Sequence, residues 1–173
     1  AFKSQNNPAL NGSIQAFLLA SRLRTLPLAS ACVMVGSAVA YPRVTAVNES
    51  TGAFWRVFGM ILLTVLLLQI LSNWANDLGD YENGAEGAER TDRMVASGQL
   101  STAVMKRAIV ALGALAFCCG LAAVVVAFWE SSRLVEGIAM VGLGVLAIGA
   151  AYRYTAGHNP YGYRGLGDMM VLI

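Results

Sequence analysis

The chain has 173 residues, of which 57% are hydrophobic and only 13% charged, and its formal net charge is +2. Together with a mean hydropathy of +0.59, these values exclude an ordinary soluble domain and predict an all-α, polytopic transmembrane helix bundle in a lipid bilayer. Nucleic acid is not implied as a partner. The three cysteines all lie in apolar stretches, which favours buried thiols over a disulfide framework.

Residues 1–21 are predicted to be a polar lead-in, followed by a membrane domain over residues 22–173. Residues 1–12 are polar and rich in Asn, so we expect them to be disordered. They lack the basic start, short apolar core and small-residue cleavage site of a secretory signal.

Four complete membrane spans and the start of a fifth are predicted. A span needs about 20 apolar residues. Pro42 and residues 48–52 are expected to form the first loop, with Trp55 as an anchor at the membrane surface. Residues 168–173 are too few to cross a bilayer, so we expect the chain to be the front part of a longer protein. The four complete apolar runs cover residues 26–41, 57–74, 108–129 and 134–152.

Glycines are frequent in the last two complete runs, where they are expected to let helices approach closely. These glycines are Gly113, Gly120, Gly137, Gly142, Gly144 and Gly149.

The distribution of basic residues predicts the orientation. Cytoplasmic loops of membrane proteins carry an excess of Lys and Arg. Nine of the twelve basic residues would lie on one side and three on the other, which places the N-terminus and the loops 81–101 and 153–167 in the cytoplasm. The nine are Lys3, Arg22, Arg24, Arg90, Arg93, Lys106, Arg107, Arg153 and Arg164, and the three are Arg43, Arg56 and Arg133.

A group of polar residues closes the second apolar run, at residues 71–80. If the helix continues there, Asn73 lies one turn before Asp77, and Asn76 lies one turn before Asp80. Mg²⁺ is usually held by one or two carboxylates together with substrate phosphates. On composition alone, the favoured interpretation is an ordinary helix end that reaches water, where Asn and Asp are common. A magnesium and pyrophosphate site is the sharper hypothesis that the same residues raise.

The long loop that follows carries Arg90 and Arg93. A guanidinium group binds phosphate oxygens bidentately, so these arginines are suited to hold the other side of a pyrophosphate. The glutamates of the same loop, Glu82, Glu86 and Glu89, are expected on a solvated face.

Three stretches together resemble the UbiA-type intramembrane prenyltransferases. The sequence Asn-Asp-Leu-Gly-Asp at residues 76–80 resembles the first aspartate-rich motif of that family. Residues 22–29, Arg-Leu-Arg-Thr-Leu-Pro-Leu-Ala, are similar to the branch that prenylates 1,4-dihydroxy-2-naphthoate for menaquinone biosynthesis. Residues 154–168, from Tyr154 through Tyr-Gly-Tyr-Arg-Gly-Leu-Gly-Asp, are similar to the same branch, and the resemblance covers nearly everything from residue 22 onward.

The resemblance implies a fold of nine transmembrane helices in the bacterial cytoplasmic membrane. It also implies Mg²⁺-dependent transfer of a polyprenyl group from polyprenyl diphosphate to 1,4-dihydroxy-2-naphthoate, giving demethylmenaquinone. Asn76, Asp77 and Asp80 are the implied metal ligands, and Asp77, Asp80 and Arg93 the implied catalytic residues. The implied substrate-binding residues are Arg22, Arg24, Arg90, Tyr154, Tyr161, Arg164 and Asp168.

The chain departs from the family pattern at three points. The third acidic residue of the motif, four positions after Asp80, is replaced by Gly84, and Glu86 is the nearest substitute. The usual Arg-x-Gly-Pro-x-Arg run is shortened to Arg-Thr-Asp-Arg at residues 90–93. The second aspartate-rich motif would lie beyond Ile173, so the 173-residue piece alone is predicted to be inactive.

Other functions stay open at this point. A prenyltransferase for another acceptor, such as 4-hydroxybenzoate, is the nearest alternative, and the sequence of residues 161–168 argues against it. A transporter would use its carboxylates to line an ion path, which predicts acidic residues at mid-membrane depth in several spans. Here they lie at helix ends and in loops. The piece could also be a non-catalytic membrane protein.

Overall fold

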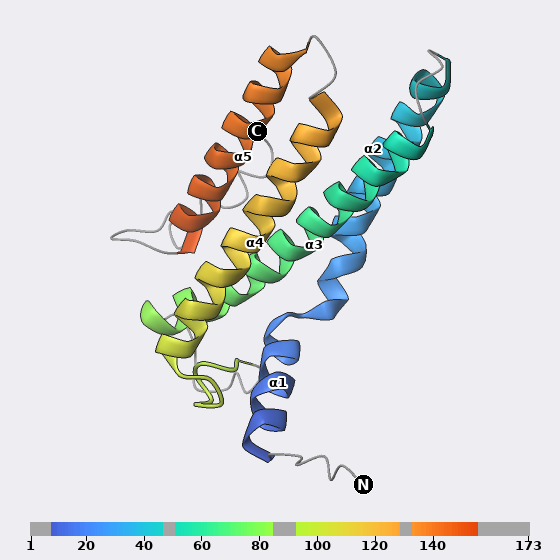
Figure 1. Ribbon diagram of the computed structural model, residues 1–173. Helices are drawn as coiled ribbons and strands as arrows, with labels where there is room; N and C mark the ends of the chain where they lie inside the picture. Colours follow the sequence, from blue (N-terminus) through green and yellow to red (C-terminus); the bar gives the residue numbers. More distant parts are fainter. Residues whose placement is uncertain (1–7, 47–50, 85–92, 129–132, 156–173) are drawn as a thin grey trace, which may run out of the picture.

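The structure, a computed structural model, describes residues 8–46, 51–84, 93–128 and 133–155. Within these ranges all regular structure is helical (Figure 1), so the predicted all-α class is confirmed. The elements are α1 Pro8–Ala20, the short 3₁₀ helix η1 Leu23–Thr25, α2 Leu26–Ala46, α3 Thr51–Glu82, α4 Thr102–Phe128 and α5 Leu134–Thr155.

Helix α3 is the centre of the bundle. It packs most extensively against α4 and next against α2, while α5 packs on α4 (Figure 1). The short helix α1 packs beside the end of α3, near the point where α4 begins (Figure 1). The chain therefore brings the turn between α1 and α2 close to the polar end of α3.

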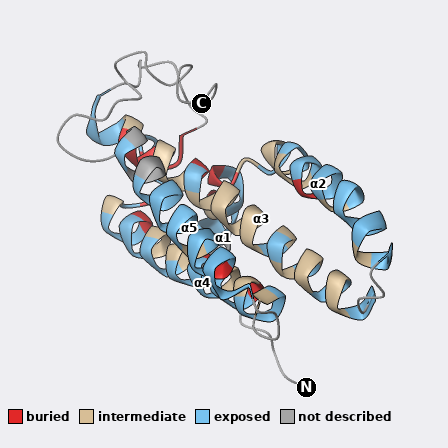
Figure 2. Ribbon diagram, turned by 90° about the horizontal axis from the view of Figure 1, so that it is seen from above, coloured by how far each residue is buried: buried red, intermediate tan, exposed pale blue. Residues whose placement is uncertain are grey.

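The long helices are suited to a bilayer. Three stretches are long and apolar enough to cross a membrane, Gly12–Ala46, Thr51–Glu82 and Thr102–Phe128, and α5 carries a shorter apolar stretch, Leu134–Gly149. Figure 2 shows that residues along α2 and α5 are largely exposed. Many of these exposed residues are large and apolar, as expected where lipid tails replace water as the solvent. The chain is thus a membrane helix bundle.

The expectation of a disordered start was wrong from Pro8 onward. Residues 8–20 form α1, in which Ala16 and Ala20 are 0% and 3% exposed. The prediction gave weight to the Asn-rich start, whereas the sequence from Ile14 to Ala20 is apolar enough to pack on the bundle. Residues 1–7 lie outside the described residues.

Two helices extend beyond the predicted apolar spans, and the loop predicted at Pro42 was wrong. Helix α2 continues through Pro42 to Ala46 instead of ending at a loop there. Proline removes one backbone hydrogen bond, which is tolerated near the end of a transmembrane helix. Helix α3 begins at Thr51 and ends at Glu82, so the polar residues after Trp74 lie within a helix. The expected fifth segment, residues 168–173, lies outside the described residues.

Close helix approach is seen at three of the glycines. A Cβ atom added to Gly137 on α5 would lie 3.3 Å from the Cβ atom of Phe128 on α4, and the other two glycines lie on α4. A Cβ atom added to Gly120 would lie 3.3 Å from the Cγ2 atom of Thr64, and one added to Gly113 would lie 3.7 Å from Leu71. Both contacts join α4 to α3. In the described part of the chain, an added Cβ would meet nothing within 4 Å at Gly142, Gly144 and Gly149.

Aromatic side chains gather at one end of the α2–α3 pair. The ring of Tyr41 lies 5.2 Å from that of Phe54 and 6.0 Å from that of Trp55, measured between ring centroids. Phe58 continues the group, 5.5 Å from Trp55. Tyr and Trp concentrate at membrane–water interfaces, so this cluster marks the membrane boundary opposite the polar end of α3.

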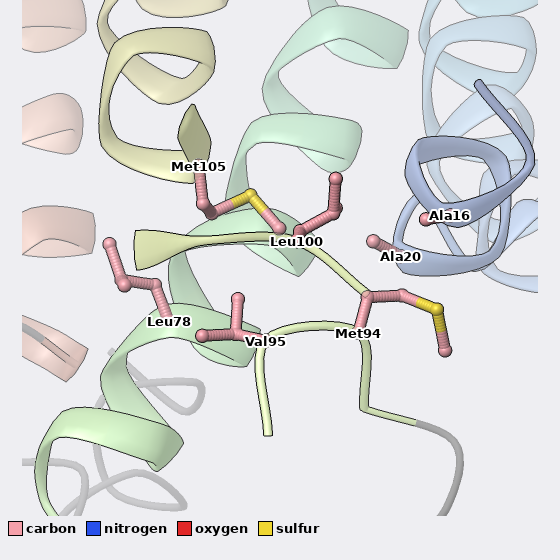
Figure 3. Packing of buried hydrophobic residues seen from close by; sticks show 7 residues of the cluster. All are labelled: Ala16, Ala20, Leu78, Met94, Val95, Leu100 and Met105. Atoms are coloured by element: carbon pink, nitrogen blue, oxygen red, sulfur yellow. The ribbon is translucent and has the colours of Figure 1, made fainter. Parts of the chain in front are cut away.

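A small hydrophobic core lies at the polar end of α3 (Figure 3). Its side chains come from four segments that are distant in sequence: α1, the end of α3, the loop segment 93–100 and the start of α4. Because the described side chains are most fully buried here, this end of the bundle is well suited to hold polar groups in fixed positions. The core residues are Ala16, Ala20, Leu78, Met94, Val95, Leu100 and Met105.

Candidate functional site

The last turns of α3 place two polar side chains inside the protein and two at its edge. Asn73 and Asp77 are 5% and 2% exposed. Asn76 and Asp80 are half-buried. The helix continues as expected, so the predicted spacing of these residues on its surface holds. A buried carboxylate requires hydrogen bonds or a counter-charge, and the partners of Asp77 come from the following loop.

Asp77 binds the backbone of the loop segment 93–100. Its Oδ2 atom accepts hydrogen bonds from the backbone N–H groups of Met94, at 3.2 Å, and Val95, at 3.3 Å. Its Oδ1 atom lies 3.7 Å from the Nη1 atom of Arg93 and accepts no hydrogen bond from the described residues. Asp77 therefore fixes the start of this segment against the end of α3.

Arg93 joins the two carboxylates of the motif. Its Nη2 atom forms a hydrogen-bonded ion pair with Oδ2 of Asp80, while its Nη1 atom faces Asp77. The guanidinium group is buried, with Arg93 only 4% exposed. The structure thus brings together the three residues that the sequence predicted to be catalytic. The two carboxylates also fix the plane of the Arg93 guanidinium group. A fixed plane is what bidentate binding of an anion requires.

A second arginine approaches from the turn between α1 and α2. Arg22 adopts a left-handed backbone conformation, with φ 46° and ψ 58°, and no other non-glycine residue in the described ranges has a positive φ. Such a conformation costs about 1–2 kcal/mol for a residue with a side chain. The Arg22 carbonyl accepts hydrogen bonds from the backbone N–H and the hydroxyl of Thr25, at 2.8 and 2.9 Å. The turn that carries Arg22 is bonded on both sides of this residue to Asn73, four residues before Asp77 on α3.

Side chains of α3 hold this turn in place. Nδ2 of Asn73 donates to the carbonyl of Ser21 at 2.8 Å and to Oγ1 of Thr25 at 3.0 Å. The indole N–H of Trp74 donates to Oγ of Ser21 at 3.1 Å. Gln69 adds a longer contact to Thr25, at 3.4 Å.

Sequence reasoning missed these partners. It grouped Asn73 with Asp77 as a source of oxygen ligands, whereas the amide nitrogen of Asn73 binds the turn. The short polar break from Ser21 to Thr25, between two apolar stretches, was the available signal.

The structure does not bring every predicted substrate-binding residue to this site. Arg24 is exposed on η1. Tyr154 lies in the last turn of α5, and its side chain is outside the description. Glu82 is exposed, as predicted, and forms an ion pair with Lys106 at 2.6 Å. Arg90, Tyr161, Arg164 and Asp168 lie outside the described residues, as does Glu86.

The oxygen atoms at this end of α3 are of the kind that a divalent metal ion binds, with substrate and water completing its coordination. Within the described ranges no three His, Cys, Asp or Glu side chains are grouped as a closed metal cluster. Asp80 and Asn76 offer a half-buried carboxylate and amide, and Oδ1 of Asp77 is buried and accepts no hydrogen bond from the described residues. Mg²⁺ commonly takes one or two carboxylates and fills its remaining positions with water and phosphate oxygens.

The fold and site define an integral membrane protein that gathers acidic and basic side chains at one end of its helices. Residues 29–173 match the UbiA prenyltransferase family. The chain belongs to this family, and the resemblance inferred from its motifs is confirmed.

Several relatives share a common name. The chain is 37% identical over 166 residues to the 1,4-dihydroxy-2-naphthoate octaprenyltransferase of Haemophilus influenzae, which covers 95% of this chain and 51% of that protein. It is 40% identical over 162 residues to the Escherichia coli protein of the same name, covering 92% and 49%. The Mycobacterium tuberculosis protein is 31% identical, covering 93% and 50%. The chain therefore spans about half the length of these relatives. No solved structure gave a significant match.

Proposed function

We propose that the complete protein transfers a polyprenyl group from polyprenyl diphosphate to 1,4-dihydroxy-2-naphthoate, with Mg²⁺, in menaquinone biosynthesis. The observation that carries the proposal is the cluster of buried Asp77 and Arg93 with half-buried Asp80 at one end of a membrane helix. The names of the relatives supply the acceptor. Because the chain spans about half the length of these relatives, we propose that its residues form only part of the active site.

The chemistry explains the residue types. Breaking the allylic C–O bond leaves negative charge on the departing diphosphate, and fixed positive groups stabilise that charge. Mg²⁺ bound at the site would neutralise part of it. Asp80 and Asn76 would hold the metal ion, and Arg93 and Arg22 would orient the phosphate oxygens. Apolar helices would keep water away from the allylic cation, while the prenyl tail lies among Leu and Val side chains.

The proposal includes the orientation of the protein in the membrane. The polar end of α3 and the N-terminus would face the cytoplasm of a bacterial cell. The described acidic side chains of α3 lie in its last turns, at Asp77, Asp80 and Glu82, whereas a transporter would need them along its spans. This placement supports an enzyme that works at the membrane surface.

The test is prenyl transfer by the full-length gene product in proteoliposomes. The assay contains Mg²⁺, a long-chain polyprenyl diphosphate and either 1,4-dihydroxy-2-naphthoate or 4-hydroxybenzoate. We expect product from the naphthoate, and a loss of roughly 100-fold or more in kcat for Asp80→Asn. Glu136→Gln is the matched control, since Glu136 is an exposed carboxylate paired with Arg133 at the other end of the bundle. No product from the naphthoate with folded wild-type protein would overturn the proposal.

A further inference from the structure

The conformation of Arg22 needs external support. Arg22 follows the end of α1 at a position where helices often carry a left-handed glycine, and a residue with a side chain keeps that conformation only where its surroundings enforce it. Within the turn, Thr25 holds the Arg22 carbonyl through both its backbone N–H and its hydroxyl. These bonds are local and leave the position of the whole turn relative to α3 undetermined.

Asn73 supplies the missing link between the turn and α3. Its Nδ2 atom donates to one group before Arg22, the Ser21 carbonyl, and to one group after it, Oγ1 of Thr25. Asn73 is 5% exposed, so water does not compete for these bonds. Trp74 reinforces the same attachment through its contact with the Ser21 hydroxyl.

The location of Asn73 gives this attachment a functional meaning. Asn73 lies four residues, or about one helical turn, before Asp77 and on the same face of α3. The helix face that presents the carboxylate therefore also fixes the turn that carries Arg22. Any shift of the turn along α3 would move the Arg22 guanidinium relative to Asp77 and Asp80.

We propose that Asn73 and Thr25 are positioning residues for the substrate diphosphate, holding the turn of residues 21–25 so that Arg22 faces the carboxylate end of α3. Neither residue touches substrate or metal in this role. The inference rests on the proposed function, in which Arg22 binds the diphosphate. It assigns Asn73 a role different from the oxygen ligand that its spacing from Asp77 indicated.

A kinetic test uses the full-length protein with polyprenyl diphosphate and 1,4-dihydroxy-2-naphthoate. We expect Asn73→Ala and Thr25→Val each to raise the KM for polyprenyl diphosphate by roughly tenfold, with the KM for the acceptor unchanged. The double variant Asn73→Ala with Arg22→Ala should have the same KM for polyprenyl diphosphate as Arg22→Ala alone, since both changes remove the contact between Arg22 and the diphosphate. A fall in kcat alone, or fully additive effects, would overturn the inference.

Thr64→Val is the matched control for Thr25→Val. Both changes replace a hydroxyl by a methyl group of similar size. The Thr64 hydroxyl bonds the carbonyl of Met60 in its own helix, whereas the Thr25 hydroxyl joins the turn to α3. We expect Thr64→Val to leave both KM values unchanged, and a KM increase equal to that of Thr25→Val would contradict the assignment.

A second measurement needs no activity. Spin labels at Leu19 on α1 and Tyr81 on α3, which are 61% and 47% exposed, report the distance across the turn by pulsed electron paramagnetic resonance in a background without native cysteines. Asn73→Ala should broaden the distance distribution, and Thr64→Val should not. An unchanged distribution in Asn73→Ala overturns the role of Asn73. Absence of prenyl transfer by the wild-type protein overturns the proposed function instead, so the two failures are distinguishable.

Discussion

Two carboxylates one turn apart on α3 have different surroundings. Asp77 is buried and bound to two backbone N–H groups, while Asp80 lies at the edge of the site and pairs with Arg93. Asp77 therefore contributes to the structure of the loop segment 93–100 as well as to the charge of the site. Asp80 is more accessible than Asp77, so a metal ion or substrate would replace Arg93 as the partner of Asp80 more readily.

Substitutions of Asp77 should separate these contributions. Asp77→Asn keeps an oxygen that accepts the two backbone hydrogen bonds, whereas Asp77→Ala leaves two buried N–H groups without a partner. We expect Asp77→Ala to destabilise the protein by about 1–3 kcal/mol more than Asp77→Asn, measured by thermal unfolding in detergent. Glu136→Ala, at an exposed position, is the control and should change little. Equal stability of the two Asp77 variants would contradict this account of the loop.

Arg22 offers a test of its backbone conformation. Arg22→Gly and Arg22→Ala both remove the guanidinium group, but only glycine adopts a positive φ at no steric cost. We expect the glycine variant to be more stable than the alanine variant by about 1 kcal/mol. Both should weaken diphosphate binding equally, measured as the KM for polyprenyl diphosphate. Equal unfolding temperatures of the two variants would argue against a left-handed residue at this position.

Local spacing was enough to predict part of the site. The intervals between Asn76, Asp77 and Asp80 determine which side chains share a helix face once the helix is assumed. The partners of Asn73 were not predictable in this way, because Ser21 and Thr25 lie about fifty residues earlier in the chain. Only the packing of α1 beside the end of α3 brings them together.

Helices were predicted better at their centres than at their ends. Apolar composition located α2, α3, α4 and α5, since a bilayer span needs a long apolar run. The ends depend on which polar groups find partners. Helix α3 continues eight residues beyond the predicted apolar span, which ends at Trp74, and in this extension Asp77 and Asp80 are bound by the following loop. Composition alone does not contain that information.

The contact between α3 and α4 can be tested at two glycines of the same helix. Gly113→Ala adds a methyl group in ordinary contact with Leu71, whereas Gly120→Ala places it 3.3 Å from Thr64, which must move. Replacing a helical glycine by alanine gains roughly 0.5–1 kcal/mol where space allows. We expect Gly113→Ala to be the more stable of the two variants in thermal unfolding. The reverse order would show that the two helices approach more closely at Gly113.

Orientation in the membrane is a property of the whole molecule. Glu82 and Arg133 have side chains that are 41% and 67% exposed and lie at opposite ends of the bundle. In bacterial spheroplasts, with native cysteines replaced, a membrane-impermeant maleimide should label Arg133→Cys directly and Glu82→Cys only after permeabilisation. This expectation follows from the excess of basic residues on the side of Glu82. The opposite labelling pattern would invert the proposed topology.

The aromatic cluster and the acidic end of α3 together indicate how deep the site lies in the membrane. At 1.5 Å per residue, the roughly 30 Å hydrocarbon layer corresponds to about 20 residues of helix. Counted from Trp55, where the aromatic cluster marks one boundary, that distance ends close to Asp77. The acidic site would then lie at the level of the lipid phosphates. A substrate with a long hydrocarbon tail and a diphosphate head already has its two parts at these depths, so it could enter by sideways diffusion without ever leaving the bilayer.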